Sequence, residues 1–421
     1  MKKTIFNIAA LFGGLTFLAS CSPDDYTYKD NTIVDLSTIT RLEIKPNQLM
    51  VLADGHAQLD FRPYLYTEEG HLVPDDRVKE EWLEYVSDEG VEINRRFSTT
   101  DASLVGKTLN VQAKLKGSTV TSDKVSFTVA APLEAQYERE IVIPVVMHII
   151  QTTEEVEELY SKFDEDRLHQ IVERMNNIFS GSVSHNPVGV NTHIRFQLAE
   201  YNPYGKRMIE KGINRLVVKE IDGNNKFEDF LIAQHLVWPA SKYMNIWLMS
   251  DRKKNVPNFG FELSENCVPH FVNEGVAEED ILEGLELTKD VDLENLLPIQ
   301  AGIIYKLQEL DEWNRSFGLD VTNDLIYYVG RFLGLSSTCS YVEESSDYCD
   351  DTIDYKETDE SANNTWYKTM SGCYFLSENI MDDPTGVHNS VSKDQCKRMR
   401  WVLENCPERS FWKSNFAFKG R

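Results

Sequence analysis

Residues 323–338 read NDLIYYVGRFLGLSST, and the interpretation of the whole chain depends on this stretch. It predicts a helix that stops at Gly334, because a glycine directly after the last apolar residues of a helical pattern is a common C-terminal signal. Gly330 lies inside the predicted helix, where glycine costs roughly 1 kcal/mol relative to alanine. Taken alone, the stretch also fits an ordinary amphipathic helix capped by glycine.

Composition and charge limit the class of protein. The chain has 421 residues, of which 41% are hydrophobic, enough for a buried core and for two or three domains. Its formal net charge is −25, so its surface repels phosphate groups. We therefore expect no nucleic-acid partner and no binding of an anionic membrane through the folded surface.

The N-terminus has the pattern of a bacterial export signal. Two lysines precede an apolar run at residues 5–18, which is too short to span a bilayer comfortably as a mature helix. Residues 18–21 read LASC, which resembles the lipobox of bacterial lipoproteins. We predict a signal peptide at residues 1–20, a lipid anchor on Cys21 and a polar tether at residues 21–37, in the outer membrane or at the cell surface. The alternative is an ordinary secretory signal with a chance cysteine.

Six cysteines remain beyond Cys21, and their number predicts disulfides in an exported protein. No C-x-x-C pair is present, so a thiolate zinc site is not expected. Cys396 and Cys406 lie on one predicted helix, roughly 15 Å apart, too far to bridge each other. The candidates for pairing are Cys267, Cys339, Cys349, Cys373, Cys396 and Cys406.

Residues 38–131 predict an all-β domain. Short runs of alternating apolar and polar residues recur, for example at 57–61 and 108–113, and turn residues separate them. About seven strands of this kind fit an immunoglobulin-like sandwich. The segment resembles the bacterial Ig-like domains that follow lipoprotein tethers. We expect it to act as a spacer or an adhesive module.

Residues 132–421 predict a mixture of strands and helices. Residues 141–150 form a nearly continuous β-branched run, typical of a strand buried on both faces. His148 inside this run is more typical of a core residue than of a metal ligand. Apolar residues at helical spacing predict a helix at 164–179. Further strands are expected at residues 193–198, 243–249 and 301–305.

Four further stretches give the predicted helix a context. They read IPVVMHII at 143–150, DYCDDTI at 347–353, SENIMDD at 377–383 and SKDQCKRMRWVL at 392–403. In this order, with the helix among them, they resemble the first strand, acidic loop, Met-turn and closing helix of the pappalysin-like metzincin zinc-metalloproteinases of Bacteroidetes. The resemblance implies an α+β metzincin-like (zincin) domain with a mixed sheet, a central helix and a Met-turn, behind the Ig-like domain.

The helix departs from this family at the zinc motif. Active members carry H-E-x-x-H-x-x-G-x-x-H, in which the histidines bind zinc and the glutamate activates the metal-bound water. Aligned on Gly334, the histidine positions hold Tyr327, Arg331 and Ser337, and the glutamate position holds Tyr328. Hydroxyls and neutral phenols are poor zinc ligands, and arginine stays protonated. We therefore expect no catalytic residue and no bound zinc, although zinc is the cofactor of active relatives.

Positions with a structural role do carry over from the family, and they are Gly330, Gly334, Met381, Asp350 and Asp351. The resemblance further implies a disulfide between Cys349 and Cys373. Asp350, Asp351 and Asp354 could also bind calcium through their carboxylates, and a solvated acidic loop is the other interpretation.

Three functions follow from these observations. The first is a surface lipoprotein that is a catalytically inactive pseudopeptidase and binds a peptide or protein. The second is an active zinc metalloendopeptidase with a displaced ligand set, which requires three or more of His148, His193, His235, His388 and nearby carboxylates to converge on one metal. The third is an adhesive or structural protein that acts through the Ig-like domain.

Overall fold

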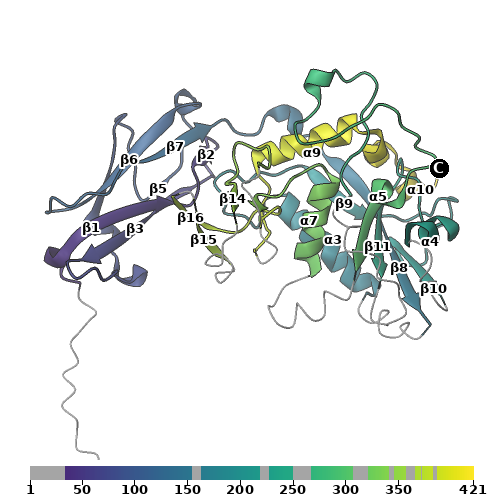
Figure 1. Cartoon of the computed structure of the whole chain (residues 1–421), viewed down its shortest axis with the longest axis horizontal. Helices are drawn as coiled ribbons and strands as arrows, with labels where there is room; N and C mark the ends of the chain where they lie inside the picture. Colours follow the sequence, from purple (N-terminus) through teal and green to yellow (C-terminus); the bar gives the residue numbers. More distant parts are fainter. Residues whose placement is uncertain are drawn as a thin grey trace, which may run out of the picture.

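The computed structural model describes residues 34–153, 163–218, 227–249, 267–306, 321–340, 346–356, 366–370, 372–382 and 386–421. The predicted signal peptide, Cys21 and most of the predicted tether lie outside these ranges. Among the helices described, none has the length and apolar character needed to cross a membrane. The chain mixes α and β structure, with several sheets and few helices (Figure 1).

The N-terminal part consists of two β-sheets that pack face to face. One sheet has the strand order β1-β3-β5, and the other has the order β2-β7-β6-β4. Across the interface, the ring centroid of Phe127 lies 5.4 Å from that of Phe61 and 5.3 Å from that of Phe97. The strands are β1 Ile39–Pro46, β2 Met50–Leu52, β3 Leu59–Thr67, β4 Leu83–Ser87, β5 Arg96–Phe97, β6 Thr108–Leu115 and β7 Val125–Ala130. The segment is built from strands and short turns, as predicted, while its immunoglobulin-like topology stays a prediction.

A second region is organised around a five-stranded sheet. Strand β8 pairs with β9, β10 and β11, and β12 extends the sheet beyond β11. The strands are β8 Ile141–Thr152, β9 Ile194–Leu198, β10 Ile213–Val218, β11 Met244–Met249 and β12 Gly302–Lys306. Every ladder that the structure describes in this sheet is parallel, so these strands do not form the predicted mixed sheet. A parallel arrangement suits β8 because helices cover both of its faces.

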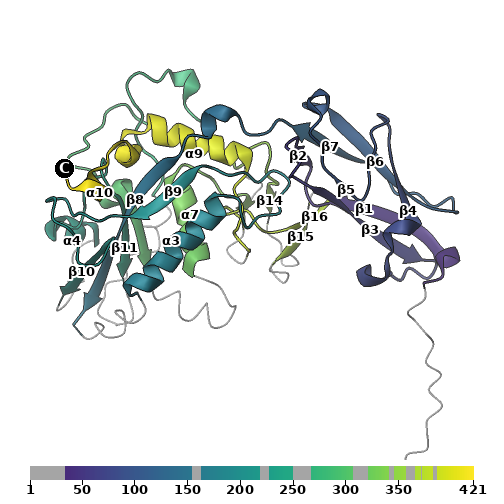
Figure 2. The same cartoon turned by 180° about the vertical axis from the view of Figure 1, so that it is seen from behind.

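The two faces of β8 explain its continuous apolar sequence. Side chains alternate between the faces of a strand. Those of Val145, Met147 and Ile149 join a core with α3 and α7, whereas that of Ile150 joins a separate core with α4 and α5. Helices α3 and α7 contact each other, and Figure 2 shows α3 from the side on which it covers the sheet. The helices are α3 Glu165–Phe179, α4 Phe227–Ala233, α5 Pro298–Ala301 and α7 Val321–Phe332.

Two short strand pairs and the last helices complete the fold. Strand β13 pairs in parallel with β14, and β15 with β16 forms an antiparallel hairpin. Strand β16 contacts β1, so the hairpin joins the N-terminal sheets to the second region (Figure 1). These elements are β13 Cys339–Ser340, β14 Tyr355–Lys356, β15 Tyr367–Met370, β16 Cys373–Leu376, α9 Lys393–Asn405 and α10 Phe416–Lys419. The predicted helix at 164–179 is α3, and the predicted strands at 193–198, 243–249 and 301–305 are β9, β11 and β12.

Candidate functional site

Helix α7 ends in a Schellman motif. The Leu335 N–H donates to the Gly330 carbonyl oxygen at 2.9 Å, and the Gly334 N–H donates to the Arg331 carbonyl oxygen at 2.9 Å. These two bonds define this type of helix end. Gly334 has a φ of 88°, in the left-handed region that suits glycine. The helix therefore stops where the sequence predicts.

Gly330 is the point at which α7 meets the turn that carries Met381. A Cβ atom at residue 330 would lie 2.3 Å from the Sδ atom of Met381, closer than such atoms approach one another in proteins. Met381 is fully buried, so its side chain has little room to retreat. The close approach explains why a helix interior holds a glycine despite its low propensity.

The loop after α7 is tied to the same turn. The Met381 carbonyl oxygen accepts hydrogen bonds from the Thr338 N–H at 3.0 Å and from the Ser337 hydroxyl at 3.1 Å. The Ser337 oxygen also lies 2.8 Å from the Cys339 carbonyl oxygen and accepts from the Cys339 N–H at 3.3 Å. The Ser337 hydroxyl group is therefore within hydrogen-bonding distance of backbone groups of both Met381 and Cys339.

The Met381 turn is fastened to helix α9. The side-chain amides of Asn379 and Gln395 exchange two hydrogen bonds of 2.9 and 3.0 Å. Asn379 Oδ1 also accepts from the Met381 N–H at 2.9 Å. Gln395 Oε1 accepts from the Ser392 N–H, which completes a capping box at the start of α9. Motif residues of the Met381 turn and of α9 thus hold each other in place.

The acidic loop reaches the same end of α9. Asp351 accepts from the Ser392 hydroxyl at 2.7 Å and from the Asp394 N–H at 2.9 Å. A carboxylate at a helix N-terminus is stabilised by the backbone donors there. Burial, and after it the neighbouring carboxylate of Asp394, raise the pKa of Asp351 to about 7. Asp350 is exposed beside it, so the two matched acids of the loop have different surroundings.

Two buried arginines hold the C-terminal end of α7. Arg398 Nε donates to the Gly334 carbonyl oxygen at 2.6 Å, and Arg409 Nε donates to the Phe332 carbonyl oxygen at 2.8 Å. Arg409 is fully buried, and its other nitrogens donate to further backbone carbonyls. These guanidinium groups supply partners for carbonyls that a helix end leaves unpaired.

The four positions of the zinc motif hold side chains with other contacts. Tyr327 and Tyr328 are half-buried, with ring centroids 5.5 Å apart, and the Tyr328 ring also lies 5.9 Å from that of Tyr305 in β12. Arg331 Nη1 donates to a backbone carbonyl of the turn that follows, at 3.3 Å. With Ser337 bonded to the backbone, this set offers no imidazole and no carboxylate to a metal. A zinc ion does not fit these residues.

His148 is a satisfied core residue, as predicted. It is fully buried in β8, with Nδ1 2.9 Å from Asn214 Nδ2 and Nε2 3.0 Å from Asn245 Oδ1. Asn245 Nδ2 donates to two backbone carbonyls, so Oδ1 is the acceptor and the network assigns the histidine proton to Nε2. Burial lowers the pKa of His148 to about 4.

The other histidines of the displaced ligand set lie on separate loops. His193 precedes β9, His235 is exposed after α4, and His388 is buried between the Met381 turn and α9. Across the described ranges, no three His, Cys, Asp or Glu side chains are placed to hold a metal ion. Neither the displaced zinc set nor a calcium site in the acidic loop finds support in these residues.

The predicted disulfide between Cys349 and Cys373 is wrong. Both residues are buried thiols, and so are Cys267, Cys396 and Cys406. Cys373 packs with Cys339 and Phe375 in one small cluster. Cys349 lies in the acidic loop, where burial and then the charges of Asp347 and Asp351 raise the pKa of its thiol. The fold thus places the two thiols in different surroundings. Burial raises the pKa of Cys373 to about 12 and that of Cys267 to about 11.

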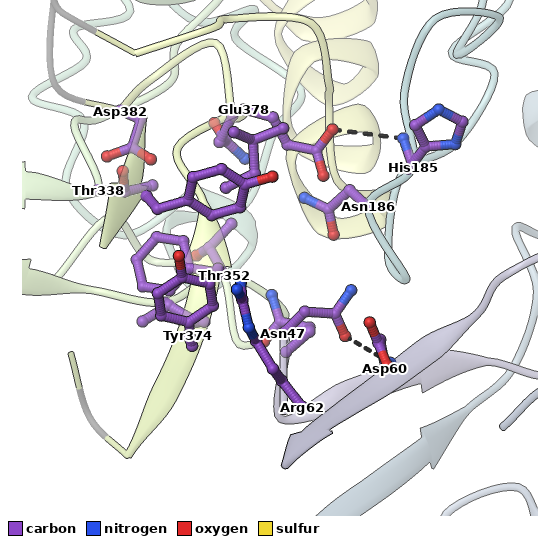
Figure 3. Close-up of a pocket in the computed structure, with 16 residues that line it drawn as sticks. Asn47, Asp60, Arg62, His185, Asn186, Thr338, Thr352, Tyr374, Glu378 and Asp382 are labelled. Atoms are coloured by element: carbon purple, nitrogen blue, oxygen red, sulfur yellow. Dashed lines mark hydrogen bonds between the residues drawn. The ribbon is translucent and has the colours of Figure 1, made fainter. Parts of the chain in front are cut away.

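A polar pocket of about 260 Å³ lies beside the Met381 turn, between the N-terminal sheets and the second region (Figure 3). Strand β3 supplies Asp60 and Arg62 on one wall, and Glu378 lies across the pocket, directed towards His185. Its lining comprises Asn47, Gln48, Asp60, Arg62, His185, Asn186, Thr338, Thr352, Ile353, Tyr367, Tyr374, Phe375, Leu376, Glu378, Asn379 and Asp382.

Glu378 is the buried acid of this pocket, and sequence reasoning missed it. Its side chain is 7% exposed, and Oε2 accepts from the His185 N–H at 3.3 Å and from the Ser184 hydroxyl at 3.5 Å. Both bonds are long, and burial raises the pKa of Glu378 to about 7. Its position inside the SENIMDD motif gives no local signal that the side chain faces a pocket.

No protein-family model and no curated protein matches the chain. Among solved structures, mature mirolysin of Tannerella forsythia in complex with a cleaved peptide is similar, with a TM-score of 0.40 and 17% identity over 66% of this chain and 97% of that chain. Mirolysin in complex with compound 9 has a TM-score of 0.41 and 18% identity over 66% and 97% of the two chains. A mutant of Tannerella forsythia promirolysin has a TM-score of 0.38 and 17% identity over 66% and 85%. Likenesses this low assign neither a family nor an activity to the chain.

Proposed function

We propose that the second region of this chain is a metzincin-like metallopeptidase domain that lacks a zinc centre and binds a peptide or protein without cleaving it. The observation that carries the proposal is the contact of Gly330 in α7 with Met381. Around that contact, Tyr327, Arg331 and Ser337 stand where the three zinc ligands are expected, and none of them can replace an imidazole.

Hydrogen bonds between protein groups hold the helix and the turn in place. The amide pair of Asn379 and Gln395 fixes the turn to α9, and Arg398 and Arg409 fix the end of α7. A frame held in this way keeps its shape without a metal. Loss of the catalytic centre is therefore compatible with a folded domain that still offers a surface to a ligand.

The purified full-length chain tests this proposal directly. We expect far less than one zinc per chain by elemental analysis after exposure to excess zinc and gel filtration. We also expect no chelator-sensitive cleavage of a peptide library. Fluorescent peptides from the same library should nevertheless bind measurably. One tightly held zinc per chain with chelator-sensitive proteolysis would overturn the proposal, and so would absence of binding to every peptide and protein tested.

The proposal includes a lipid anchor on Cys21 at the outer membrane or cell surface. It rests on the LASC sequence at residues 18–21 and on the apolar run before it. Mass spectrometry of the mature protein from its membrane fraction should find a lipid-modified Cys21 as the first residue. A Cys21→Ala variant should leave that fraction, whereas a wild-type protein that starts at another residue would contradict the anchor.

A further inference from the structure

The polar pocket beside the Met381 turn is formed jointly by the two parts of the molecule. Asp60 and Arg62 come from β3 of the N-terminal sheets, whereas His185, Glu378 and Asp382 come from the second region. The residues that line the pocket include none of the four zinc-motif positions, although Thr338 lies next to Ser337, so this site is adjacent to the zinc motif but distinct from it. Its volume of about 260 Å³ suits one amino-acid side chain or a small molecule.

The charges on the N-terminal wall are already paired. Arg62 Nη2 lies 2.8 Å from Asp75 Oδ2, and its guanidinium lies 4.3 Å from the ring centroid of Tyr374. Asp60 Oδ1 lies 3.1 Å from Arg95 Nε. This wall therefore presents little net charge to a ligand.

The opposite wall carries an acidic residue that has no cationic partner in the part of the chain that the structure describes. Glu378 is 93% buried, given its exposed fraction of 7%, and forms no ion pair within the described residues. Its only hydrogen-bond donors there are the two distant ones that reach Oε2, and Oε1 accepts from no described residue. Asp382, which accepts from the Tyr355 hydroxyl, adds a second carboxyl group to the lining. Glu378 therefore gives this side of the pocket a carboxyl group without a cationic partner among the described residues.

A buried carboxylate with weak hydrogen bonds and no counter-ion is unfavourable, and a cation brought by a ligand would relieve that cost. A metal ion is not favoured, because no three acidic, histidine or cysteine side chains among the described residues are placed to hold one. The side chains of Tyr367, Tyr374 and Phe375 also belong to the lining, and they suit the methylene groups of an organic cation.

We propose that this pocket binds an organic cation, an alkylammonium or guanidinium group such as that of a lysine or arginine side chain, with the carboxylate of Glu378 as its counter-ion. The methylene chain lies against Tyr374 and Phe375. Because the pocket has walls from both parts of the chain, the bound cation links the N-terminal sheets to the second region and stabilises their association.

Isothermal titration calorimetry on the full-length chain tests this inference. The ligands are Nα-acetyl-lysine methylamide and Nα-acetyl-arginine methylamide, with putrescine to distinguish a free amine from a peptide side chain. The uncharged control is Nα-acetyl-norleucine methylamide, which keeps the methylene chain. We expect at least one cation to bind at least tenfold more tightly than the norleucine derivative. Equal affinities, or no binding of any cation, would overturn the inference.

A matched pair of variants tests the role of the carboxylate. Glu378→Gln keeps the side-chain shape and should lower the affinity for the cation at least tenfold. Glu286→Gln, which removes the same charge from an exposed position, should leave it unchanged. Unchanged binding by a folded Glu378→Gln protein would refute the assignment. If that variant does not fold, the comparison of lysine with norleucine on the wild-type chain still decides the matter, and its outcome is independent of the zinc analysis.

Discussion

Replacing Gly330 by alanine probes the contact between α7 and the Met381 turn. In a helix interior with free space, this substitution should stabilise the protein by about 1 kcal/mol, the difference in helix propensity. Here the new Cβ atom would lie 2.3 Å from the Met381 Sδ atom. Overpacking of this kind costs about 1–3 kcal/mol, so we expect Gly330→Ala to lower the free energy of unfolding by about 1 kcal/mol overall. Urea denaturation of the full-length chain, followed by circular dichroism, measures the change.

A double-mutant cycle separates this contact from other effects. Met381→Ala removes the clashing atoms and by itself should cost about 2–5 kcal/mol, because it leaves a cavity. In that background Gly330→Ala should become neutral or stabilising, with a coupling energy of about 1–3 kcal/mol. Gly275→Ala, at a position with open space around its Cβ, serves as a control and should change little. Stabilisation by Gly330→Ala in the wild-type background, or a coupling energy of zero, would refute the packing argument.

Three further results follow from buried groups. The pKa of Glu378 is raised from 4.5 to about 7 in the folded chain. Burial of this side chain therefore does not destabilise the folded state at low pH, and the destabilisation grows as the pH rises from about 4.5 to about 7. Glu378→Gln should therefore gain stability relative to wild type by up to about 3 kcal/mol between about pH 4 and pH 8 in urea denaturation, and an equal difference at both values would contradict this. Arg409→Met should lose at least about 3 kcal/mol in thermal unfolding because several buried carbonyls lose their donor, whereas the exposed Arg96→Met should lose little. In the absence of reductant, Cys349 and Cys373 should react with iodoacetamide, but only once the protein is denatured. A disulfide-linked peptide that contains both residues would contradict the structure.

Local sequence signals predicted the elements whose form depends on near neighbours. Gly334 marks the end of α7 because the left-handed backbone at this position favours glycine whatever the rest of the fold does. The β-branched run of β8 predicted a strand buried on both faces, and separate cores indeed cover them. The motif residues Asn379 and Gln395 were noted for their resemblance to a family, and the structure gives each a hydrogen-bonding role.

Features that depend on distant segments could not be predicted in the same way. Strand β10 was not predicted, because its partially exposed side chains give neither a continuous apolar run nor a clean alternation. The parallel pairing of the sheet is decided by tertiary contacts, and the predicted mixed sheet was therefore wrong for the described strands. The resemblance implied a disulfide between Cys349 and Cys373, but whether two thiols meet depends on the tertiary fold, which places them in different surroundings. The pocket brings Asp60 close to Glu378, and nothing in their local sequences indicates that proximity.

Zinc stoichiometry after restoration of the motif tests the central claim most directly. The restored variant carries Tyr327→His, Tyr328→Glu, Arg331→His and Ser337→His, and a register control carries Ser336→His in place of Ser337→His. Elemental analysis after gel filtration should find about one zinc per chain in the restored variant, because three imidazoles would then surround one position. It should find almost none in the wild type and clearly less in the register control. Zinc bound by the wild type, or a folded restored variant that binds none, would contradict the account.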